Sequence, residues 1–138
     1  MVRRLLICLL LAGVVAVAQT KIKTVPAAAT SRVSGSEMYR TYCAVCHGLA
    51  GKGDGPAAVA LKARPTDLTQ LAKRNGGKYP DAKVNTAITA VPDMPAHGTS
   101  EMPIWGNIFR QIEGQGHEQS VKLRVYNLVK YLESIQGK

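Results

Sequence analysis

The sequence has little aromatic bulk. Only 5% of its 138 residues are aromatic, with one Trp and one Phe, although 46% are hydrophobic. This length predicts one small domain, and so few large rings leave its core short of apolar volume. The composition permits a buried prosthetic group without requiring one, because Leu, Ile and Val can also fill a core.

Cysteines and basic runs are also scarce. The chain has three cysteines, and Cys8 lies in an apolar N-terminal run, which leaves Cys43 and Cys46 for the folded domain. Two cysteines three residues apart cannot build a disulfide framework. The net charge is +9, yet no run of Lys or Arg exceeds two residues. This pattern disfavours a nucleic-acid-binding arm and favours a basic surface that docks on acidic partners.

No apolar run has the length of a membrane span. The uncharged run Leu5–Val17 has about 13 residues, whereas a spanning helix needs roughly 20. It follows Arg3–Arg4 and ends at the small-x-small stretch Ala16–Ala18. These features predict that residues 1–18 form an export signal, whose removal would lower the charge to +7. Retention of the segment as an anchor is the alternative.

The remaining pattern predicts helices and loops. Residues 19–33 are polar and aperiodic, which predicts a flexible leader before a domain at residues 34–138. Ser34 and Glu37 fit a capping box at the start of a first helix. No strand pattern or internal repeat is present. The other expected elements are a glycine-rich loop at 48–55, a short helix opened by Pro56, a helical turn at 67–73, a turn at 75–77, a helix over 82–90, an extended loop at 91–106 and a long helix from Glu118.

The stretch YCAVCHG at residues 42–48 decides among the possible chemistries. A structural zinc site needs four ligands, so His97 or His117 would have to join Cys43, Cys46 and His47. A redox dithiol needs a βαβ setting, and no strands are expected. Cys-x-x-Cys-His is the attachment motif of covalent haem, in which the thiols bond the porphyrin and the histidine ligates iron. Haem is the favoured interpretation.

The sequence also resembles the class I c-type cytochrome family. The resemblance rests on YCAVCHG, then GKGDGP, LKARPTDLT, HGTSEMPIWG and VYNLVKYLESIQ in the family's order. It implies an all-α cytochrome c fold, with crossed terminal helices and loops enclosing one covalent haem c. It implies a one-electron carrier of a periplasmic respiratory chain rather than an enzyme. The expected partners are respiratory donor and acceptor proteins, membrane-bound ones in particular, without nucleic acid or a small-molecule substrate.

The resemblance assigns a role to five residues. Cys43 and Cys46 would form the thioethers, and His47 would be the proximal iron ligand. The carbonyl of Pro65 would accept a hydrogen bond from His47 Nδ1–H, which makes the imidazole a stronger donor. Met102 would be the distal ligand.

Two Met-Pro pairs compete for the distal role. In each pair the proline favours an extended backbone at the preceding methionine, either Met94 or Met102. Spacing does not separate them, but the resemblance favours Met102, which lies shortly before Trp105-Gly106. His97 is a third candidate. If the sixth coordination position of the haem iron were open or weakly held, the protein would instead suit the role of a sensor or an enzyme.

Several further residues have two interpretations. Gly35 and Tyr39 are expected to meet Leu128 and Tyr131 where the terminal helices cross. Trp105 and Tyr79 could bind haem propionates, although ordinary core packing is the favoured interpretation. His117 is expected on the surface. Lysines around the expected haem edge could form a docking ring or be isolated surface residues; these are Lys52, Lys62, Lys73 and Lys78.

Overall fold

The computed structural model describes residues 26–89, 102–114 and 116–137, and in these ranges it contains helices and loops but no strand. The predicted all-α class is therefore confirmed. The expected export signal and residues 91–101 of the expected loop at 91–106 lie outside the described residues. Within the described part, no helix is long and apolar enough to cross a membrane.

One helical segment carries the cysteine motif. It consists of α1 (Gly35–Met38), a π-helical turn η1 (Tyr39–Cys43) and α2 (Ala44–His47). Ser34 is its N-cap, and its hydroxyl accepts a hydrogen bond from the Glu37 amide at 3.2 Å. The predicted cap is thus confirmed, since a serine here satisfies an amide that lacks a partner within the helix.

Short elements connect this segment to the C-terminal half. The helix expected after Pro56 is only the 3₁₀ turn η2 (Ala58–Ala60). Asp67 then caps η3 (Leu68–Gln70), which continues into α3 (Leu71–Arg74). The predicted turn at 75–77 follows, and α4 (Asp81–Thr89) begins one residue earlier than expected.

Two helices complete the described fold. The final helix α6 (Glu118–Ser134) begins at the predicted residue. The sequence reasoning missed α5 (Trp105–Glu113), although Trp105, Ile108, Phe109 and Ile112 have helical spacing and Gly114 follows its last residue. The three prolines before it had favoured a loop through this region.

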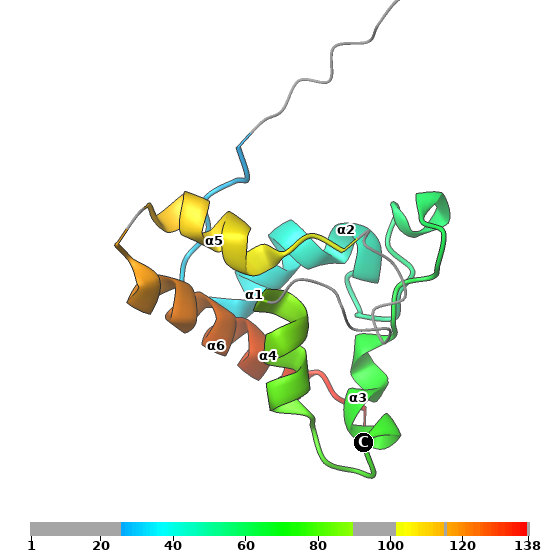
Figure 1. Cartoon of the computed structure of the whole chain (residues 1–138). Helices are drawn as coiled ribbons and strands as arrows, with labels where there is room; N and C mark the ends of the chain where they lie inside the picture. Colours follow the sequence, from blue (N-terminus) through cyan, green and yellow to red (C-terminus); the bar gives the residue numbers. More distant parts are fainter. Residues whose placement is uncertain (1–25, 90–101, 115, 138) are drawn as a thin grey trace, which may run out of the picture.

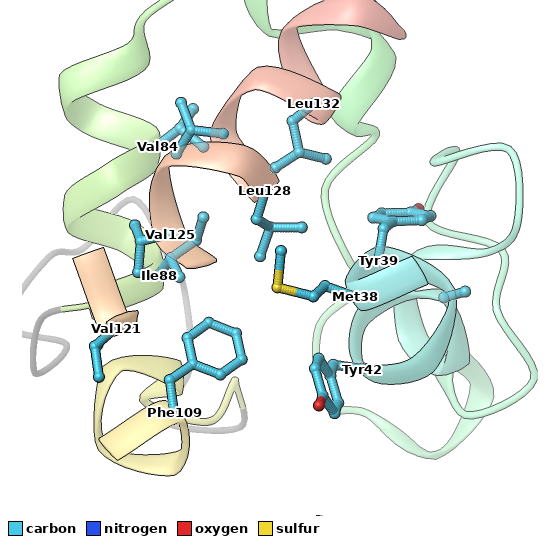
Figure 2. Close-up of a cluster of buried hydrophobic side chains, with 12 residues drawn as sticks. Met38, Tyr39, Tyr42, Val84, Ile88, Phe109, Val121, Val125, Leu128 and Leu132 are labelled. Carbon is cyan, nitrogen blue, oxygen red and sulfur yellow. The ribbon is translucent and has the colours of Figure 1, made fainter. Parts of the chain in front are cut away.

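The core forms around α6, which contacts α1, α4 and α5 (Figure 1). Figure 2 shows side chains from these four helices and η1 converging on one cluster. Met38 and Phe109 are completely buried in it. The cluster comprises Met38, Tyr39, Tyr42, Ala44, Val84, Ile88, Phe109, Val121, Val125, Leu128, Val129 and Leu132.

The first and last helices meet at a glycine. A Cβ atom at Gly35 would lie 2.2 Å from the Asn127 carbonyl oxygen and 2.7 Å from Tyr131 Cβ. One turn later, the rings of Tyr39 and Tyr131 pack with their centroids 5.3 Å apart. The predicted contact of Gly35 and Tyr39 with the last helix is confirmed, and Leu128 belongs to the same core.

The end of the expected flexible leader is bound to the helices, which corrects that expectation for residues 28–33, here called the N-terminal strap. Arg124 of α6 donates to both the hydroxyl and the carbonyl oxygen of Thr30, at 2.9 Å each. The Asn127 side chain donates to the Arg32 carbonyl at 3.1 Å. Local polarity gave no sign of these partners, because they are about 90 residues away in the sequence.

Gly35→Ala should destabilise the holoprotein by about 3 kcal/mol, at the upper end of the usual cost of overpacking, because the new methyl group meets backbone that cannot rotate away. Guanidinium unfolding followed by far-ultraviolet circular dichroism measures this change. Gly106→Ala is the matched control, since its Cβ would lie 3.1 Å from the Thr89 carbonyl oxygen. Equal losses in the two variants would contradict the prediction.

Candidate functional site

Cys43, Cys46 and His47 lie on the last two turns of the first helical segment. Cys43 ends the π-helical turn, in which the Ala44 amide bonds to the Tyr39 carbonyl, and the other two residues lie on α2. Both cysteines are partly buried, and no disulfide joins them. Single π-turns within helices often occur at functional sites, where they change the direction of the following side chains.

The glycine-rich loop satisfies the carbonyl groups at the end of α2. Backbone amides of Gly53, Gly55 and Ala57 donate to the carbonyls of His47, Cys46 and Val45, at 2.8, 3.1 and 2.9 Å respectively. In addition, the Tyr39 hydroxyl donates to the Gly48 carbonyl at 2.6 Å. A short helix end that would otherwise lack partners is therefore fixed by its own downstream loop.

The hydrogen bond of His47 Nδ1 goes to a different carbonyl from the one predicted. His47 Nδ1 lies 3.0 Å from the carbonyl oxygen of Thr66, one residue after Pro65. The Pro65 carbonyl instead faces Gly53, where a Cβ would lie only 2.1 Å from it. The assignment of Pro65 as the acceptor is corrected to Thr66. The physical argument remains, because a carbonyl can only accept, so Nδ1 carries the proton and Nε2 keeps its lone pair.

Thr66 is held in place by three neighbouring contacts. The Leu68 amide donates to the Gly51 carbonyl at 2.7 Å, which joins this segment to the glycine-rich loop. The Asp67 carboxylate accepts from the Thr69 amide and hydroxyl, and these bonds keep the pKa of that carboxyl below its usual value. Gln136, beyond α6, donates to the Leu68 carbonyl at 2.7 Å. The C-terminus thereby supports the residue that orients His47.

The surroundings of Cys43 favour a neutral thiol. Burial, and then the neighbouring Cys46, raise the pKa of Cys43 to about 12. Redox-active dithiols show the opposite behaviour, because a nearby positive charge or helix N-terminus lowers the pKa of their attacking cysteine. Cys43 lies near the C-terminal end of its helical segment, so the dithiol interpretation loses its electrostatic basis.

Of the three candidates for the distal iron ligand, Met102 lies within the described residues. Met102 is partly buried and lies three residues before α5. Met94 and His97 lie outside the described residues. Among the residues that the structure describes, no three His, Cys, Asp or Glu side chains converge in a way that could hold a metal ion. A four-ligand zinc site thus finds no support in the described part.

The remaining predicted residues have separate roles. Tyr79 donates its hydroxyl to the Val129 carbonyl at 3.1 Å, and burial raises the pKa of that phenol. The Trp105 ring packs on Tyr42 and Phe109, with centroids 5.3 and 6.0 Å away. Both contacts support the core-packing interpretation. His117 is exposed, as expected, and so are the four lysines named above.

Comparison with known proteins settles the family. The family model described as Cytochrome c matches residues 33–136, three quarters of the chain. The chain belongs to the cytochrome c family. No curated protein and no solved structure gave a significant match. Membership implies covalently bound haem c and haem-based electron transfer, and it favours the haem interpretation of the cysteine motif over zinc or a redox dithiol.

The donor set of this cytochrome fits haem c. Two partly buried thiols lie one helical turn apart, where they would reach the two vinyl groups of one porphyrin edge, and His47 would ligate the iron through Nε2, since Nδ1 is bound to the Thr66 carbonyl. When bound, the haem supplies an iron centre that gains and loses one electron. Cys43 and Cys46 would hold its edge, and Thr66 fixes the imidazole of His47.

Gly53→Ala should move the segment at 65–66 away from the glycine-rich loop, weaken the bond between His47 and Thr66, and raise the haem reduction potential. The potential rises because an imidazole without this bond is a weaker donor, which stabilises ferric iron less. Potentiometric titration measures the shift. Gly76→Ala is the control, since Gly76 also has a positive φ (67°, against 74° at Gly53) but has no atom within 4 Å of its added Cβ. A similar shift in both variants would attribute it to backbone strain instead.

Proposed function

We propose that this cytochrome is a mono-haem, one-electron carrier of a periplasmic respiratory chain and not an enzyme. The main supporting observation is the orientation of His47 by the Thr66 carbonyl, which makes the imidazole a strong and fixed ligand. With Met102 on the opposite side of the iron, both axial positions would be filled by protein. The iron could then change oxidation state without binding a substrate.

Features of the sequence support one haem and export from the cytoplasm. The full sequence has one Cys-x-x-Cys-His motif, which provides for one covalent haem. The basic start, the short apolar run and the small-x-small stretch of residues 1–18 support export. A chain that retained the apolar run would instead be tethered to the membrane. The mass of the mature holoprotein distinguishes these two forms, since cleavage would leave Gln19 as the first residue.

Met102→Ala should remove the weak near-infrared sulfur-to-iron band of the ferric protein, lower the reduction potential and allow carbon monoxide to bind the ferrous form. A thioether ligand favours ferrous iron, so its loss lowers the potential. Met94→Ala is the matched control, because it changes the other Met-Pro pair and should leave all three properties nearly unaltered. The reversed pattern would assign the ligand to Met94.

The wild-type spectrum tests the carrier function separately. A wild-type protein with no sulfur-to-iron band and no carbon monoxide binding would favour His97 as the ligand. Rapid and complete carbon monoxide binding by the reduced wild type would contradict the carrier proposal, because it requires an open or weakly held position. That result would favour a sensor or a peroxide-activating enzyme.

We further propose that the redox partner docks beside the cysteine motif through an apolar contact surrounded by acidic groups. Val45, between the two cysteines, is 48% exposed, and Leu49 is 77% exposed. Both line an open, largely apolar depression of about 530 Å³, together with Pro56. Lys52 lies in the same loop. An exposed apolar patch beside the attachment site suits a brief contact. The net charge, +9 for the full sequence and +7 after removal of residues 1–18, favours an acidic partner.

Leu49→Glu should slow oxidation of the ferrous protein by hexacyanoferrate(III) several-fold, because it places a negative charge where this anion would approach. Stopped-flow absorbance gives the rate constant, and added salt should reduce the difference. Val33→Glu is the control, since Val33 is 66% exposed and precedes α1, so it makes the same change in net charge elsewhere. Equal slowing in both variants would show a general charge effect instead of a local docking face.

A further inference from the structure

We infer that the N-terminal strap positions the distal ligand, through a hydrogen-bond chain that reaches Tyr42 and a ring contact that reaches Trp105. This inference rests on the proposed role of Met102. Most residues that the strap contacts belong to α6 and not to the segment that carries the cysteine motif. At Thr30, however, it touches the residue that immediately precedes Cys43.

The hydrogen-bond chain begins at the buried guanidinium of Arg124. Arg124 is 3% exposed, and its guanidinium bonds to Glu113 through Nε and to Thr30 through Nη1 and Nη2. Glu113 is the last residue of α5, and its side chain is 4% exposed. A buried charge is tolerated when its hydrogen bonds are satisfied, and Thr30 supplies two of them here. The strap is therefore bound at Thr30 by a strong local requirement.

The hydroxyl groups of Thr30 and Tyr42 continue this chain, and each donates its proton in the same direction. Arg124 Nη1 donates to Thr30 Oγ1, and the Tyr42 hydroxyl donates to the Ala28 carbonyl at 2.5 Å. The Thr30 and Tyr42 oxygens are 2.9 Å apart. Because the Tyr42 proton is used on Ala28, Thr30 is the donor in this last pair. Each hydroxyl accepts once and donates once, an arrangement in which the bonds strengthen one another.

The Tyr42 ring carries this restraint to α5. Its centroid lies 5.3 Å from that of Trp105 and 5.7 Å from that of Phe109. Trp105 is the first residue of α5, and the N-cap Ile104 makes no side-chain capping bond. Ring packing thus fixes a helix start that has no side-chain cap. Met102 lies three residues before Trp105, so a displaced Trp105 ring would displace the methionine as well.

The contacts of the strap have two separable ends. Thr30 and Ala28 contact Tyr42, as described above. Arg32 instead bonds to partly buried Ser120 at 2.8 Å and to Glu113 at 3.4 Å, without touching Tyr42. Glu113 also binds Arg124, but through its other carboxylate oxygen. The end at Thr30 should therefore affect the iron ligand, whereas the end at Arg32 should affect only the attachment of the strap.

The experiment compares five variants of the holoprotein with wild type, one of them a stability control. Thr30→Val keeps the side-chain shape but removes the central hydroxyl, and Tyr42→Phe removes the hydroxyl while keeping the ring. Thr30→Ser is the conservative variant that retains the hydroxyl. Arg32→Gln removes the ion pair of Arg32 with Glu113 and leaves the Thr30 contacts and the pair of Glu113 with Arg124 in place. Each protein is assayed for the rate of carbon monoxide binding to ferrous iron, for the near-infrared band as temperature rises, and for amide exchange at residues 105–109.

Thr30→Val and Tyr42→Phe should raise the carbon monoxide rate about tenfold, which corresponds to the loss of one well-formed hydrogen bond from the closed state. They should also lower the temperature at which the near-infrared band disappears and accelerate exchange at residues 105–109. Thr30→Ser and Arg32→Gln should behave like wild type. Val121→Ala serves as a stability control, because Val121 is buried on α6 and Figure 2 shows it on the far side of Phe109 from Tyr42.

Three results would overturn the inference. An unchanged carbon monoxide rate in Thr30→Val and Tyr42→Phe, in a protein whose wild type shows the sulfur-to-iron band, would refute the strap's role and leave the carrier function intact. Equal effects from Val121→Ala at the same loss of stability would show that the strap acts only through global stability. A wild type without the band would refute this inference together with the assignment of Met102.

Discussion

The close contact between Gly35 and the backbone of α6 is the constraint from which the rest of the structure is built. It allows Tyr39 to reach Tyr131 and places Met38 in the core formed with α4 and α5. The cysteine motif lies only two turns further along the same helical segment, so its position relative to α6 is set at that crossing. The other end of α6 leads to Gln136, which binds the segment after Thr66. The helical segment that carries His47 and the segment that provides its acceptor Thr66 are therefore both positioned by contacts with α6 or the residues that follow it.

The loops around the motif depend on backbone hydrogen bonds more than on apolar packing. Amides at 53, 55 and 57 cap the carbonyls of α2, and Gly53 lets the Pro65 carbonyl approach closely. Such loops need their donors and acceptors paired within the protein if they are to be well ordered. A covalent haem would supply the apolar volume that the few aromatic residues do not provide. A small domain buries little apolar surface of its own, so a covalent cofactor would add to the stabilisation that the paired backbone groups provide.

The sequence predicted the elements that have strong local signals. Ser34 and Glu37 indicated a helix start, the apolar spacing from Glu118 indicated the last helix, and the spacing of Cys43, Cys46 and His47 indicated haem attachment. It did not predict α5, because the preceding prolines outweighed a short helical pattern. The acceptor for His47 was misassigned by one residue, since its identity depends on how two loops pass each other at Gly53. The strap was missed because its partners on α6 are remote in the sequence, a relation that local composition does not encode.

Arg124 illustrates why such remote contacts are hard to infer. It lies three residues after Val121 and one before Val125, on the apolar face of α6, where a periodic pattern predicts a hydrophobic residue. Its charge is compatible with burial only because Glu113 and Thr30 come from two other parts of the chain. A buried pair of this kind contributes little net stability over a well-packed apolar alternative. Its demand for specific partners can nevertheless select one arrangement of the strap, α5 and α6. That selection places the Thr30 hydroxyl against Tyr42, next to the residues that would hold the haem.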